Sequence, residues 1–92
     1  MRIIGNINHP KMKITIFKMD NKLSAKFEMG LLEQTYKFRE HHNLKSFEDT
    51  EKLITDSFME EVFKNFQMLQ KTKLNALDNY LPKIGEEFEE II

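Results

Sequence analysis

The stretch that decides the fold is residues 23–29, LSAKFEM. Apolar and polar side chains alternate along it, and the apolar ones are Leu23, Ala25, Phe27 and Met29. A period of two is typical of a β-strand with one buried face, because successive side chains on a strand point to opposite sides. Gly30 follows directly, and we expect it to end the strand in a turn or a bulge.

Two neighbouring segments show the same period of two. Upstream, residues 11–19 (KMKITIFKM) are rich in β-branched residues and place their apolar side chains on one face. Asp20-Asn21 joins this segment to residues 23–29, and both residue types tolerate the backbone of a tight hairpin. Downstream, residues 32–39 (LEQTYKFR) alternate again. Three alternating strands with short links predict an antiparallel meander over residues 11–39, with one face in solvent.

The second half of the chain has the period of helices instead. Two pairs of residues have the spacing of an N-terminal capping box, the second being the better signal: Ser46 with Asp49, and Ser57 with Glu60. We therefore expect a short helix near residues 47–54 and a long helix over about residues 57–81, or one continuous helix in their place. Pro82 ends the long helix, because proline disfavours helix in the residue before it.

These elements predict an α+β fold, a three-stranded antiparallel β-meander followed by one short and one long C-terminal helix. Residues 1–92 make a single domain, because a chain of this size buries only about 60–65% of the surface that it exposes when unfolded. Residues 1–10 form an N-terminal arm or an added edge segment, 11–39 the meander, 46–81 the helical part and 82–92 an acidic tail.

The long helix is longer than the sheet that should cover it. A helix of 25 residues is about 37 Å long, whereas a strand of eight residues is about 26 Å long. Self-association is the commonest way in which soluble chains cover such a remaining apolar face. We therefore predict a homodimer, formed through the sheet edge or through the distal half of the helix. The candidate contact residues are Leu69, Leu74, Leu77, Tyr80 and Leu81.

The formal net charge of −1 hides an uneven distribution along the chain. Residues 1–45 contain 9 basic and 4 acidic side chains (+5), whereas residues 46–92 contain 5 basic and 11 acidic ones (−6). The solvent face of the sheet, with Phe17 and Met19, is expected to carry the basic side chains Lys11, Lys13, Lys26, Lys37 and Arg39. The alternative function is therefore a nucleic-acid-binding accessory protein that uses this face. Against it, only 2 of the 14 basic residues are Arg, the residue that usually dominates base readout.

The sequence contains no recognisable catalytic motif. It has no cysteine, which excludes disulfides, thiolate metal sites and cysteine nucleophiles. Its three glycines cannot build a Gly-rich phosphate loop, and no serine lies in a G-x-S-x-G turn. The adjacent His41 and His42 are expected to point opposite ways, which would make a poor metal chelate. We predict a non-enzymatic protein with no catalytic residue, no bound metal and no cofactor.

The expected location is the cytoplasm, without a membrane partner. No apolar run approaches the roughly 20 residues that span a bilayer, and the N-terminal segment lacks the apolar core of a signal peptide. A further alternative is a carrier of small apolar ligands, with a pocket between sheet and helix. That pocket would be lined by Phe27, Phe38, Phe58 and Val62.

Two segments followed by a Phe-rich helix give the chain a resemblance to a group of small bacterial proteins. These segments are KITIFK at residues 13–18 and LEQTYK at residues 32–37. The resemblance covers residues 11–66 and implies the shape of a β-meander followed by helix. It implies no activity and no functional residue, because none is established for that group.

Overall fold

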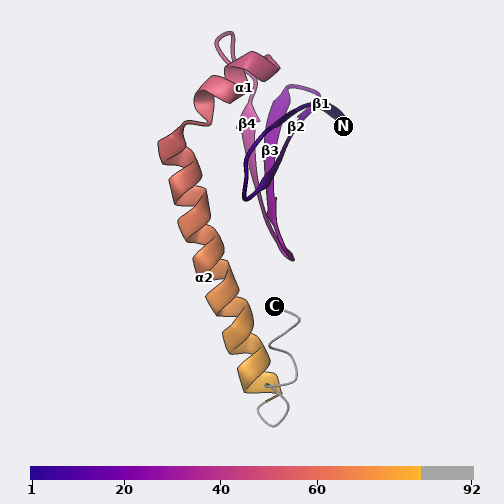
Figure 1. The fold of residues 1–92 in the computed structure, drawn as a ribbon. Helices are drawn as coiled ribbons and strands as arrows, with labels where there is room; N and C mark the ends of the chain where they lie inside the picture. Colours follow the sequence, from indigo (N-terminus) through magenta and orange to yellow (C-terminus); the bar gives the residue numbers. More distant parts are fainter. Residues whose placement is uncertain (82–92) are drawn as a thin grey trace.

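The computed structural model describes residues 1–81, which form a four-stranded antiparallel sheet followed by two helices (Figure 1). The strands lie in sequence order across the sheet: β1 (Arg2–Ile7), β2 (Lys13–Met19), β3 (Lys22–Met29) and β4 (Leu32–Arg39). The helices are α1 (Phe47–Leu53) and α2 (Asp56–Tyr80). The α+β class with an antiparallel sheet is thus confirmed. The acidic tail predicted at residues 82–92 lies outside the described residues.

The sheet has four strands rather than the three that the sequence predicts. The additional strand is β1, which runs antiparallel to β2 and forms an edge of the sheet. Its register shifts between Ile3 and Gly5, so that one residue is left without a partner. This bulge breaks the period of two by which the other strands are recognised. Of the two roles expected for residues 1–10, the added edge segment is the one found.

Both of the following hairpins have two-residue turns that begin with a residue in the left-handed region. Asp20 has a φ of 53° between β2 and β3, and Gly30 has a φ of 61° between β3 and β4. Glycine adopts this conformation without steric cost, and aspartate is among the few other residues that tolerate it. The turns fix the register of the meander, in which Leu23 lies opposite Phe38.

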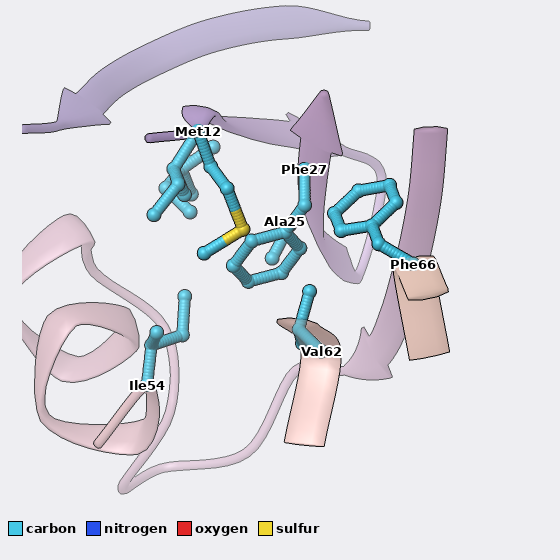
Figure 2. Packing of buried hydrophobic residues seen from close by; sticks show 8 residues of the cluster. Met12, Ala25, Phe27, Ile54, Val62 and Phe66 are labelled. Atoms are coloured by element: carbon cyan, nitrogen blue, oxygen red, sulfur yellow. The ribbon is translucent and has the colours of Figure 1, made fainter. Parts of the chain in front are cut away.

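One face of the sheet, the inner face, packs against the helices. Its central side chains are at most 1% exposed: Ile14, Ile16, Leu23, Ala25 and Phe27. The helical part adds Ile54, Val62 and Phe66, which are at most 4% exposed. Figure 2 shows Ala25 and Phe27 gathered with these three side chains and with Met12. Each of the large apolar side chains contributes about 1.5–3 kcal/mol by this burial, so the inner face holds the sheet and helices together.

The two helices begin at capping residues and are separate. Ser46 Oγ accepts a hydrogen bond from Asp49 N (3.2 Å), and the Asp49 carboxylate accepts from Lys45 N and Ser46 N. The hydrogen bonds from Lys45 and Ser46 hold the pKa of Asp49 below its ordinary value of 3.8. α2 is capped by Thr55, whose Oγ1 accepts from Phe58 N at 3.1 Å. The prediction of Ser57 as the cap is therefore wrong by two residues, and α2 begins at Asp56.

α2 lies along the inner face and continues beyond the end of the sheet (Figure 1). The turn between β3 and β4 borders the same hollow as Phe66 and Lys73, so the sheet ends beside the middle of the helix. The radius of gyration is 16.3 Å, whereas a compact domain of this length has about 12 Å. The molecule is therefore elongated. We call residues 69–81 the distal segment of α2.

Candidate interaction surfaces

The face of the sheet opposite the helices, the outer face, carries most of the charge of the sheet. Residues paired across neighbouring strands point to the same side, which defines the members of this face. In β2, β3 and β4 they are Lys13, Thr15, Phe17 and Met19, then Lys22, Ser24, Lys26 and Glu28, and then Glu33, Thr35, Lys37 and Arg39. Five of these side chains are basic and two are acidic, which gives a formal charge of +3. Four of the five residues predicted for a basic face lie here, together with Lys22, which was not among those predicted.

Lys11, the fifth residue predicted for the basic face, lies elsewhere. It precedes β2, and its Nζ lies 5.4 Å from the centroid of the Phe63 ring on α2. That distance is typical of a cation–π contact. The placement of Lys11 beside Lys13 is therefore wrong, because the period of two does not extend into the loop before β2.

Lys26 is paired with both carboxylates of the outer face. Its Nζ lies 3.5 Å from Glu33 on β4 and 3.8 Å from Glu28 on its own strand. Within residues 1–81, no ion pair involves the other four basic side chains of this face. The net positive charge of the outer face therefore comes from side chains that are accessible to a charged ligand.

The outer face also contains a hollow of about 350 Å³ with apolar side chains in its lining. Its lining residues are Met1, Phe17, Met19, Lys22, Ser24, Lys26, Glu33, Thr35 and Lys37. Met1 is 80% exposed, Met19 is 44% exposed, and Phe17 is half-buried. Ile3 lies opposite Phe17 on β1 and is 60% exposed. Apolar side chains gathered on an exposed face and bordered by charges are typical of a binding surface.

The residues predicted as dimer contacts all lie in the distal segment of α2 and differ in exposure. Tyr80 is 82% exposed and Leu69 is 39% exposed. The other three are half-buried: Leu74, Leu77 and Leu81. Leu77 follows Phe66 by three helical turns, so the helix face that packs on the sheet continues into the distal segment.

A larger groove of about 660 Å³ lies between the loop joining β1 to β2 and the first half of α2. Its lining residues are His9, Pro10, Lys11, Met12, Asp56, Met59, Glu60, Phe63, Lys64 and Gln67. Two lysines and two carboxylates border it, so their formal charges balance. The groove therefore has no preference for a ligand of either charge.

Aromatic rings fill the space in which the sequence predicts a ligand pocket. Phe27 is fully buried, and its ring centroid lies 5.8 Å from those of Tyr36 and Phe58. Tyr36 and Phe58 lie 5.2 Å apart at 71°, an edge-to-face contact. Val62 beside them is 1% exposed. Phe27 therefore belongs to the core, whereas Phe58 and Val62 also line a hollow of about 360 Å³ beside Tyr36 at the start of α2.

A polar network between β4 and α2 is absent from the sequence predictions. Gln34 Nε2 donates a hydrogen bond to the Val62 carbonyl (2.9 Å), and Tyr36 OH donates to Gln34 Oε1. Asn65 Nδ2 donates to Tyr36 OH at 3.4 Å. The only signal for it in the sequence is Gln34, a polar residue at an inner position of a strand that otherwise alternates. The network fixes α2 against the edge strand of the sheet.

The histidine pair does not have the geometry that the sequence predicts. The rings of His41 and His42 lie 4.0 Å apart at 35°, on the same side of a turn. The expectation that they point opposite ways is wrong, because His41 bridges to Leu44 in a tight turn and the chain is not extended there. Among residues 1–81, no three His, Cys, Asp or Glu residues are placed to hold a metal ion.

Neither helix of residues 1–81 combines the length and the apolar character needed to cross a membrane. Comparison of the chain with protein-family models, with curated proteins and with solved structures finds no match. The resemblance over residues 11–66 therefore stays a prediction.

Proposed function

We propose that this chain is a small non-enzymatic interaction module that forms a homodimer through the distal segment of α2. The observation that carries the proposal is the length of α2, which continues past the sheet (Figure 1) with Leu74 and Leu77 on one face and Tyr80 exposed beside them. An amphipathic helix is stabilised mainly by packing of its apolar face rather than by its intrinsic propensity. A second copy supplies the same face for that packing.

The charges beside the apolar face favour an antiparallel arrangement of the two helices. Leu74, Leu77 and Leu81 follow the alternating spacing of three and four residues that is typical of a helix–helix seam. Lys71 and Asp78 are seven residues apart and lie on one flank of that seam. In an antiparallel pair centred between them, each Lys71 lies beside the Asp78 of the partner. Two equivalent ion pairs then border the seam.

The first test is the mass of the chain in solution, measured by sedimentation or by light scattering against concentration. We expect a dimer for the native chain. Leu77→Glu should weaken the dimer by tenfold or more, about 1.4 kcal/mol, because it places a charge in the seam. Met68→Glu is the matched control, since Met68 lies on the opposite side of the same helix and is 69% exposed. Melting temperatures of both variants report any loss of the fold.

A charge swap tests the antiparallel arrangement. Asp78→Lys should weaken the dimer about three- to tenfold by placing two lysines together. Adding Lys71→Asp to it should restore the dimer, because the ion pairs are then re-formed with reversed sign. A native chain that stays monomeric at high micromolar concentration contradicts the proposal.

A further inference from the structure

The outer face of the sheet combines side chains that suit a ligand with both negative charge and apolar groups. The hollow of about 350 Å³ places Phe17 and Met19 beside Lys22 and Lys37. Neither lysine forms an ion pair within residues 1–81. Apolar side chains provide contact area, whereas the lysines favour carboxylates by charge. An acidic peptide with apolar anchor residues has the matching chemistry.

The chain itself contains a segment of this kind. Residues 82–92 (PKIGEEFEEII) contain four glutamates and one lysine, which gives a formal charge of −3. Phe88 stands between two pairs of glutamates, and two isoleucines follow. This segment complements the outer face in both charge and apolar content.

The geometry of α2 favours a contact between two copies, because the part of the hollow beside Phe17 lies far from the end of the helix. Phe88 is seven residues beyond Leu81, which is at most about 25 Å of extended chain. Lys73 of α2 borders the turn at Gly30. From Lys73 to the end of α2 is about 12 Å along the helix axis. From that turn, six more residues of strand, about 20 Å, lead to Ser24 in the hollow. The path of about 32 Å is too long, and it must also pass from the helix side of the sheet to the outer side.

We propose that the outer face is a docking site for the acidic, apolar segment of residues 82–92 of a second copy of this chain. Phe88 occupies the hollow beside Phe17 and Met19, and the flanking glutamates lie against Lys22 and Lys37. Single-stranded nucleic acid fits the same face less well. Glu33 borders the hollow, which also has only one aromatic side chain among its lining residues on which a base can stack.

The site is tested with a fluorescent peptide that has the sequence of residues 82–92, titrated with the full chain and followed by anisotropy. We expect saturable binding. A peptide carrying Phe88→Ala should bind about tenfold more weakly, since it lacks the apolar anchor. A peptide in which the four glutamates are replaced by glutamine should lose most of its dependence on salt.

The matching variants of the chain locate the site. The double variant Lys22→Glu/Lys37→Glu should reduce peptide affinity about tenfold or more. The double variant Lys45→Glu/Lys52→Glu is the matched control, because it makes the same change of charge in the loop before α1 and on α1 itself. It should bind the peptide much as the native chain does.

Three results overturn the proposal. They are no binding of the peptide, equal loss of binding in the two double variants, and a single-stranded oligonucleotide that binds the outer face more tightly than the peptide. The readout is peptide affinity and does not require that α2 pairs. The docking site is therefore tested independently of the dimer of the distal segment, which Leu77→Glu tests.

Discussion

The inner and outer faces of the sheet are built from alternate residues of the same strands, and different requirements set their composition. Inner positions such as Ile16 and Phe27 are fully buried against the helices, so shape and apolarity fix them. Outer positions such as Lys37 are exposed, so packing does not fix which residue stands there. Exposed apolar residues on that face, Met19 among them, are therefore not explained by packing against the helices.

The largest expected difference between the faces is at their phenylalanines. Phe27→Ala should lower the free energy of unfolding by about 3–5 kcal/mol, because it removes a fully buried ring and leaves a cavity. Phe17→Ala, on the outer side of the adjacent strand, should cost about 1 kcal/mol or less, since its ring is already partly in water. Denaturation in urea measures both, and equal losses would remove the distinction between the faces.

A smaller loss of stability is expected at Gly5 of β1, which lies opposite Ile16 of β2. A Cβ added at Gly5 would overlap the ring of Phe47 on α1, so Gly5→Ala forces the ring or the strand to move. We expect a loss of about 1–3 kcal/mol, the usual cost of overpacking. Asn6→Ala is the control, because Asn6 is exposed and pairs with Thr15 on the outer side. A stable Gly5→Ala variant with an unchanged melting temperature would show that α1 is not packed against β1.

The smallest effect concerns the ion pairs of the outer face. Lys26→Ala removes the contacts with Glu28 and Glu33, yet we expect a loss of only about 0.5–1 kcal/mol, because partly exposed ion pairs contribute little. The loss should shrink further at high salt. Lys13→Ala, which removes a lysine without an ion pair within residues 1–81, should change stability less still. A loss above 2 kcal/mol at Lys26 would mean that the outer face is also set by folding.

The fold could be predicted wherever one strong local pattern decides the structure. Alternation over residues 23–29 gave β3, and the apolar period with Pro82 gave the end of α2 to within one residue. β1 is harder to recognise, because the bulge between Ile3 and Gly5 breaks the alternation and the pairing with β2 is a tertiary contact. Local periodicity therefore predicts three of the four strands but not β1.

For the candidate surfaces, the side chains that lie on strands could be predicted, whereas those in loops and those in contacts between sheet and helix could not. The period of two correctly predicts that Lys37 and Arg39 lie on the outer face. It failed for Lys11 and for the pair at His41, because loops and turns follow no such period. The contact of Gln34 with the Val62 carbonyl depends on how α2 lies on the sheet, which no local pattern encodes.

The order of the strands also bears on how quickly the protein can fold. Every strand pairs with its neighbour in the sequence, so each pairing closes a connection of a few residues. Hairpins of this kind form in about 1–10 μs, and domains dominated by local pairing fold faster than those with distant strand partners. The sheet can grow outward from the hairpin of β2 and β3, and α2 then docks on a surface that already exists. We therefore expect folding in the millisecond range or faster, without the slow search for distant partners that delays many β-proteins.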